Sequence, residues 1–124
     1  MARPLQYLSY RGRGGHWSWI LHRLTGLGVL FFLLIHILDI SLIGWGPRVF
    51  DSLLIIYRGR VFRCMEVLLA GAVIYHALNG IRIIIVDFWP AATTVHRKLV
   101  YAVALIFVVV YVPTAVLMLN GLVK

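Results

Sequence analysis

Three long apolar stretches dominate this sequence and leave few folds open to it. They run from about residue 17 to 43, from 61 to 88 and from 99 to 122. Each is long enough to cross the hydrocarbon core of a bilayer as a helix, which takes about 20 apolar residues. A spanning helix satisfies its own backbone hydrogen bonds, which an open sheet in lipid does not. The sequence therefore predicts an all-α integral membrane protein with three transmembrane helices.

Composition and charge support the same class of protein. Hydrophobic residues make up 62% of the 124 residues, and the mean hydropathy is +0.95. A soluble domain of this length leaves too much surface exposed to hide so many apolar side chains. The net charge is +8, and most basic residues lie in short segments beside the apolar stretches. This placement is typical of anchoring at lipid headgroups, so we expect a membrane lipid environment and no nucleic-acid binding.

The segments between the spans suggest how the chain is divided. Residues 1–16 are basic and glycine-rich at their end, which predicts a surface arm. Residues 17–124 then form one membrane domain. Pro47 and the glycines around it end the first span, and residues 49–57 are apolar on one side. The one-sided apolar pattern of residues 49–57 predicts a short helix lying in the membrane interface.

Three spans place the two termini on opposite sides of the membrane, but the charges hardly orient them. Five basic residues fall on each side: Arg3, Arg11, Arg13, Arg97 and Lys98 on one, and Arg48, Arg58, Arg60, Arg63 and Lys124 on the other. Because basic residues favour the cytoplasmic side, an even division does not decide the orientation. We expect the amino terminus to be cytoplasmic.

Two of the five histidines lie deep in apolar sequence. His36 is 13 residues after Arg23, about 20 Å along a helix, and His76 is 11 residues before Asp87, about 16 Å. If the two spans are antiparallel neighbours, both imidazoles are expected at a similar depth. Neutral imidazole is a common axial ligand of haem iron, and facing helices often build such sites. The pair predicts haem, although either histidine could simply hydrogen-bond a neighbour.

Other residues fit the needs of a haem. Gly80 lies one turn after His76 and leaves a slot for a flat group. His22, Arg23 and Arg82 are candidates to bind the two propionates, since guanidinium pairs with carboxylate. Arg82 could instead pair with Asp87, and Arg23 could reach lipid headgroups. Zinc is a weaker alternative, because Asp39 is the only other ligand near His36 and serves equally well to orient it.

Donors and aromatic side chains gather at the start of the first span. Ser18, Trp19 and Arg23 could bind a quinone headgroup, with hydrogen bonds to its carbonyl oxygens and an aromatic wall. Ordinary interfacial residues give a similar pattern. Cys64 is the only cysteine, which excludes an intramolecular disulfide and a multi-cysteine metal or iron–sulfur site within the chain.

Two motifs resemble one known family. Residues 18–26, SWILHRLTG, resemble the H-R-x-[ST]-G segment that opens the first span of the succinate dehydrogenase cytochrome b subunit. Residues 76–87, HALNGIRIIIVD, resemble that family's H-x-x-N-G-x-R-x-x-x-x-D segment. The order of the motifs, their spacing and the three-span layout match over about residues 16–122.

The resemblance implies a membrane-anchor subunit of succinate:quinone oxidoreductase, an integral protein of the bacterial cytoplasmic membrane. Its implied partners are a flavoprotein subunit, an iron–sulfur subunit and a second hydrophobic anchor subunit, with which it forms a larger helical bundle. The implied cofactor is haem b, and the implied substrate is ubiquinone or menaquinone. His76 matches the axial haem ligand, and His22 and Arg23 match residues near the propionates and the quinone.

The sequence departs from the family pattern at three places. Ser18 is displaced by one position from the family's quinone-site serine, where this chain has Trp19. Ile83 stands where many members have a second histidine, so one propionate donor is missing. His36 is an additional histidine that could ligate a second haem, replace the ligand of the second anchor, or only pack.

Three other functions stay open from the sequence. A fumarate reductase anchor would run the same redox couple backwards. A membrane scaffold without cofactors would only dock soluble respiratory subunits, and it would tolerate apolar residues at His76 and Arg82. A small transporter subunit is disfavoured, because the intramembrane charges are few and no broken helix or repeat is visible.

Overall fold

The computed structural model describes residues 14–120, and this part of the chain is almost entirely helical. Its elements, in chain order, are α2 (Gly14–Ser41), the 3-10 helix η1 (Leu42–Trp45), α3 (Pro47–Tyr57), α4 (Arg60–Phe88), the 3-10 helix η2 (Pro90–Val95) and α5 (His96–Asn120). The sections around α2, α4 and α5 are each long and apolar enough to cross a membrane. The predicted all-α, three-span fold is therefore confirmed.

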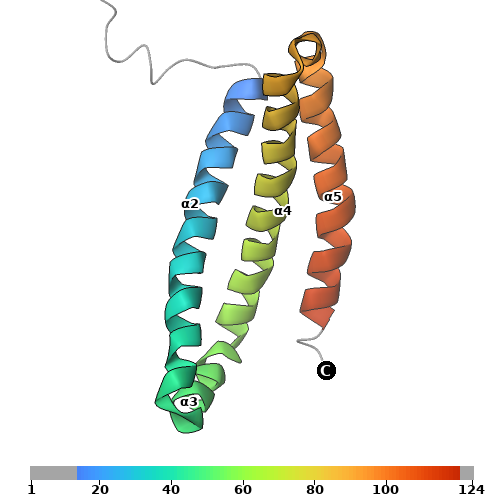
Figure 1. Ribbon diagram of the computed structural model, residues 1–124. Coiled ribbons are helices and arrows are strands. Elements are labelled where there is room, and N and C mark those ends of the chain that lie inside the picture. The colour runs from blue at the N-terminus through green and yellow to red at the C-terminus, as the bar shows by residue number, and fades with distance from the viewer. Residues whose placement is uncertain (1–13, 121–124) are drawn as a thin grey trace, which may run out of the picture.

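The three long helices lie as one layer with α4 in the middle, and in Figure 1 the chain runs down α2, up α4 and down α5. Helix α4 packs against both α2 and α5, whereas α2 and α5 touch each other much less. The start of α2, the end of α4 and the start of α5 lie at one end, and α3 lies at the other (Figure 1). The start of α2 and the end of α5 are thus at opposite ends, as three spans require.

The first helix begins earlier than the sequence indicates. We expected a span from residue 17, after a glycine-rich arm, but α2 already starts at Gly14. Packing explains the difference, because a Cβ atom at Gly15 would lie 2.9 Å from Cε1 of His96. The glycine that weakens helix propensity here lets the start of α2 lie against the start of α5. The rest of the predicted arm, residues 1–13, lies outside the described part of the chain.

The connection between the first two spans contains the predicted short helix. Gly46 has a φ of +103°, which side-chain-bearing residues rarely adopt, and it links η1 to α3. Pro47 then occupies the first turn of α3, where its missing N–H costs nothing. The Tyr57 hydroxyl donates a hydrogen bond of 2.6 Å to Oδ2 of Asp39 and so ties the end of α3 to α2.

Very little apolar surface is buried within the chain itself. Val67 is the one buried hydrophobic side chain among residues 14–120, while large apolar residues are exposed along all three spans. Helices in lipid gain no hydrophobic driving force from contacting one another, so close packing and hydrogen bonds hold them together. Gly71 is an example: a Cβ there would lie 2.9 Å from the Tyr111 ring of α5, and the Tyr111 hydroxyl donates to the Val67 carbonyl oxygen at 3.1 Å.

Candidate functional site

Two histidines from neighbouring helices face each other near one end of the bundle. His22 of α2 and His76 of α4 stack with ring centroids 4.1 Å apart and planes 5° from parallel. Because the helices are antiparallel, moving one residue forward along α2 corresponds to moving one residue back along α4. This contact therefore fixes the register of the pair, and Ser18 lies opposite Asn79 one turn closer to the end.

Each histidine lies over a glycine of the opposite helix. A Cβ atom at Gly26 of α2 would lie only 2.8 Å from Cε1 of His76. A Cβ at Gly80 of α4 would lie 3.7 Å from Cε1 of His22. We predicted that Gly80 leaves a slot for a flat group, and the ring of His22 borders that slot. The tighter contact is at Gly26, where any larger residue would push His76 aside.

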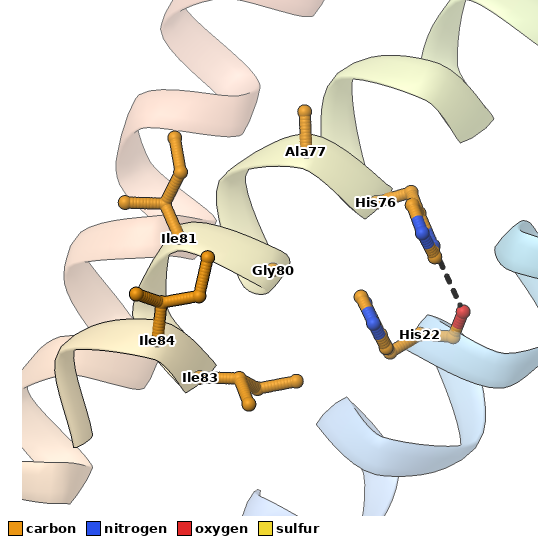
Figure 2. A pocket seen from close by; sticks show the side chains of 7 residues that line it. All are labelled: His22, His76, Ala77, Gly80, Ile81, Ile83 and Ile84. Carbon is orange, nitrogen blue, oxygen red and sulfur yellow. Dashed lines mark hydrogen bonds between the residues drawn. The ribbon is translucent and has the colours of Figure 1, made fainter. Parts of the chain in front are cut away.

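The hydrogen bond of His76 defines its tautomer. Nδ1 of His76 lies 3.1 Å from the backbone carbonyl oxygen of His22 (Figure 2), and a carbonyl can only accept, so Nδ1 carries the hydrogen. In the neutral ring this leaves Nε2 with a free lone pair. The same pattern, a backbone acceptor on one ring nitrogen, is how proteins orient histidine as a metal ligand.

An open depression of about 510 Å³ lies beside the two rings. Figure 2 shows His22 and His76 at one side of it and α4 along its length. Its lining residues are His22, His76, Ala77, Gly80, Ile81, Ile83 and Ile84. Imidazole nitrogen is thus the one kind of strong metal donor among the lining side chains, and the other walls are apolar. Nδ1 of His22 is buried and has no hydrogen-bond partner within residues 14–120.

The expectation that His36 and His76 lie at a similar depth is wrong. His36 is 14 residues beyond His22 on α2, about 21 Å along the helix, so it lies far from the level of His76. It is exposed on the outer surface and stacks on Phe32 with ring centroids 5.4 Å apart. Our estimate of depth assumed that Arg23 and Asp87 lie at the same membrane surface. In the structure Arg23 lies beside the level of His76 instead.

Arg82 is at the centre of a separate polar cluster that joins three helices. Its Nη1 donates to Oγ of Ser18 and to Oδ1 of Asn79, both at 2.8 Å. Its Nη2 lies 3.0 Å from Nδ1 of His96 at the start of α5. Asp87, the other predicted partner, is exposed and makes no ion pair with Arg82. Binding of a haem propionate by Arg82 stays a prediction, and it would require Arg82 to give up some of these hydrogen bonds.

The predicted quinone residues point in two directions. Ser18 is only 5% exposed, and its hydroxyl donates to Oδ1 of Asn79 at 2.7 Å. Trp19 is 49% exposed, and the guanidinium carbon of Arg23 lies 4.0 Å above the centre of its ring. The structure thus places Trp19 and Arg23 together on the outer surface of α2 and turns Ser18 inward against α4.

Sequence reasoning missed two members of the polar cluster. Asn79 is completely buried and receives hydrogen bonds from both Ser18 and Arg82. Its position three residues before Arg82, on the same helical face, was the available signal. His96, which no motif singles out, is partly buried against Gly15 and Arg82. Nothing in the local sequence indicates that contact.

Comparison with known proteins decides the family. A family model described as "Succinate dehydrogenase/Fumarate reductase transmembrane subunit" matches residues 2–113. The chain belongs to this family. It is 38% identical over 114 residues to the succinate dehydrogenase 2 membrane subunit SdhC of Mycobacterium tuberculosis, covering 92% of this chain and 83% of that protein. It is 31% identical over 103 residues to a succinate dehydrogenase hydrophobic membrane anchor subunit of Halobacterium salinarum, covering 81% and 79%.

Family membership settles the coarse function and location. This chain is a transmembrane subunit of the succinate dehydrogenase/fumarate reductase family, and its relatives are subunits of an oxidoreductase complex. The predicted membrane anchor is therefore confirmed, as is the expectation of partner subunits in general terms. Both motifs that carried the resemblance meet at one place, since His22 stacks on His76 and Ser18 bonds to Asn79.

Proposed function

We propose that this chain is the cytochrome b anchor of a succinate:quinone oxidoreductase, binding haem b through His76 and forming part of the quinone-reduction site. The observation that carries the proposal is the Nδ1 hydrogen bond from His76 to the His22 carbonyl, which leaves Nε2 free for iron. The implied partners are a flavoprotein subunit, an iron–sulfur subunit and a second hydrophobic anchor. The membrane is the bacterial cytoplasmic membrane, with the amino terminus on its cytoplasmic side.

The residues around His76 fit a haem. The depression beside it is open on one side, which suits a cofactor shared with a second anchor subunit, and its aliphatic walls suit a porphyrin. Nδ1 of His22, buried and without a protein partner in the described chain, is available to a propionate oxygen. Arg23 has no protein acceptor within residues 14–120 and is a second candidate. Haem b, when bound, would supply a one-electron redox centre.

The quinone function is assigned to the outer surface of α2. The indole of Trp19 offers a flat wall for the quinone ring, and the guanidinium of Arg23 offers donors to a carbonyl oxygen. Reduction of the quinone to the quinol takes two electrons and two protons. The electrons come from succinate through the partner subunits, and the protons come from the adjacent aqueous face. Ser18 contributes indirectly, because its own hydroxyl is bonded inward.

A difference spectrum of the purified complex tests the haem assignment. The dithionite-reduced minus oxidised absorption of the wild type should show a b-type band, with haem quantified per complex. His76→Ala should abolish this band or reduce it severely. His36→Ala is the matched control, because it removes an exposed imidazole at another depth. It should leave the band unchanged if one haem is bound, and halve the haem content if His36 holds a second.

Two results would redirect the proposal. A wild-type complex without b-type haem would favour the scaffold that docks soluble respiratory subunits. Rates of succinate oxidation and fumarate reduction, measured with the same complex and quinones of different potential, separate the dehydrogenase from a fumarate reductase anchor. The family description covers both directions, so this second measurement is needed in either case.

A further inference from the structure

We propose that Asn79 is a positioning residue for the quinone-facing turn of α2, acting through Ser18 to set the direction in which Trp19 and Arg23 project. The inference rests on the proposed quinone function of Trp19 and Arg23. It assigns to Asn79 a role in quinone binding without contact between Asn79 and the quinone.

The first step is the burial of Asn79 and the use of its oxygen. Its side chain is 0% exposed, which is costly for an amide unless it is hydrogen-bonded. Oδ1 accepts from Oγ of Ser18 at 2.7 Å and from Nη1 of Arg82 at 2.8 Å. Since Arg82 also donates to Ser18 at 2.8 Å, the three side chains form a closed triangle between α2 and α4.

The second step is that further polar contacts hold this triangle of side chains in place. The Tyr75 hydroxyl lies 3.3 Å from the backbone carbonyl oxygen of Ser18, and Nη2 of Arg82 lies 3.0 Å from Nδ1 of His96 on α5. Polar contacts from α4 thus converge on one turn of α2, and His96 of α5 holds Arg82 from the other side. In lipid, where helices gain nothing by hiding apolar surface from each other, such contacts set how a helix is rotated about its axis.

The third step is the geometry of the turn itself. Successive residues of a helix are separated by about 100°, so Trp19 projects about 100° and Arg23 about 140° away from Ser18. Fixing Ser18 against α4 therefore directs both Trp19 and Arg23 outward, where they stack on each other at 4.0 Å. Without the acceptor at Asn79, Ser18 loses one of the hydrogen bonds that fix the rotation of the first turns of α2, and the direction of the pair is less well defined.

The amide nitrogen of Asn79 takes no part in these contacts, so the oxygen is the atom that positions Ser18. Nδ2 is buried and has no protein partner within residues 14–120. The contacts to Ser18 and Arg82 use the oxygen alone. An aspartate at this position keeps the oxygen acceptor and faces the positive charge of Arg82, whereas a leucine of similar size removes the acceptor. The two substitutions therefore separate the role of the acceptor from the role of side-chain volume.

The experiment compares Asn79→Leu and Asn79→Asp in the purified complex. Asn79→Leu should raise the KM for a short-chain quinone about three- to tenfold, the range expected for the loss of one hydrogen bond, with kcat nearly unchanged. The succinate:dye reductase rate, which bypasses the quinone site, should not change. Asn79→Asp should restore the KM to within about twofold of the wild type. An assembled Asn79→Leu complex with a wild-type KM would overturn the proposal.

Two further variants keep the test decisive. Ser18→Ala removes the other end of the same hydrogen bond, and it decides the question with the same KM criterion if Asn79→Leu does not assemble. Tyr111→Phe is the matched control, because it removes one interhelical hydrogen bond between α4 and α5 without touching α2. Its KM should equal that of the wild type, and an equal rise in this variant would make the effect a general consequence of looser packing and overturn the assignment.

Failure of this inference differs from failure of the proposed function. Trp19→Ala and Arg23→Gln should each raise the KM for the quinone. If they do while Asn79→Leu and Ser18→Ala do not, the quinone site stands and the positioning role is wrong. If neither Trp19→Ala nor Arg23→Gln affects quinone kinetics, the proposed location of the quinone is itself wrong.

Discussion

His76 donates its Nδ1 hydrogen to the backbone carbonyl of His22 across 3.1 Å, and the two imidazole rings lie 4.1 Å apart and nearly parallel. A backbone acceptor is a durable means of orienting a ring, because no side-chain substitution on α2 removes it. A shift of α2 relative to α4 can still move this carbonyl, however. The glycines that let the helices approach therefore decide whether Nε2 keeps its direction.

The first prediction concerns Gly26, which lies under His76. A Cβ here would be 2.8 Å from the ring, closer than real contacts allow, so Gly26→Ala should displace His76. We expect a destabilisation of about 1–3 kcal/mol, typical of overpacking, and a large loss or shift of the b-type absorption band. The measurements are the Tm of the complex and its reduced-minus-oxidised spectrum.

Two other glycines provide internal controls for this prediction. A Cβ at Gly80 would be at an ordinary contact distance of 3.7 Å from His22, and a Cβ at Gly28 would meet nothing within 4 Å. Gly80→Ala should therefore have a small effect and Gly28→Ala none on the spectrum. Equal losses in all three variants would show that helix flexibility, rather than space for His76, is what glycine provides.

The spans were predictable from sequence because they depend on local patterns, whereas the role of His76 stays a prediction. Apolar length predicts a transmembrane helix, and a histidine inside such a helix predicts a function. The apolar side of residues 49–57 likewise predicted the short helix α3, which begins two residues earlier, at Pro47. These features are set by one segment at a time, so no knowledge of the neighbouring helix was needed.

The pairing of the helices was not predictable in the same way. The register of α2 against α4 is set by the interlocking of His22 with Gly80 and of His76 with Gly26, which lie on different segments. Counting residues from the charged ends of the spans gave the wrong depth for His36, because Arg23 lies at the level of His76. The inward turn of Ser18 was missed for the same reason, since its acceptor is Asn79, 61 residues away.

The second prediction concerns His96, which accepts a hydrogen bond from Arg82 through Nδ1 and so must be neutral there. His96→Lys places a second cation against the guanidinium and should lower the Tm of the complex. His96→Gln keeps a possible acceptor and should have a smaller effect. Arg97→Gln, at an exposed neighbouring position, is the control that changes charge without touching the cluster. A Tm for His96→Lys equal to that of the control would contradict the contact.

The third prediction concerns the separation of α4 and α5 in the middle of the membrane. A Cβ at Gly71 would lie 2.9 Å from the Tyr111 ring, which also stacks on Phe107 with centroids 5.1 Å apart. The ring is held on two sides and has little room to move, so Gly71→Ala should destabilise the complex by about 1–3 kcal/mol. Thermal unfolding measures this effect. Combining Gly71→Ala with Tyr111→Leu should recover part of the loss, and an additive loss would argue against a clash between these two residues.

The last prediction uses the hydrogen bond between Tyr57 and Asp39 at the other end of the bundle. The bond to the Asp39 carboxylate, with smaller contributions from burial and the negative charge, raises the pKa of the Tyr57 hydroxyl above its usual value. A raised pKa in the folded state means that the stabilisation is fully present below the unfolded pKa of about 10. It is then lost as the pH rises through the folded value.

Tyr57→Phe should therefore lower stability by about 0.5–1.5 kcal/mol at neutral pH, and the difference from the wild type should shrink above about pH 10. The measurement is the Tm of both proteins between pH 7 and the alkaline limit of the complex, and a difference that stays constant throughout would show that the hydroxyl does not carry the effect.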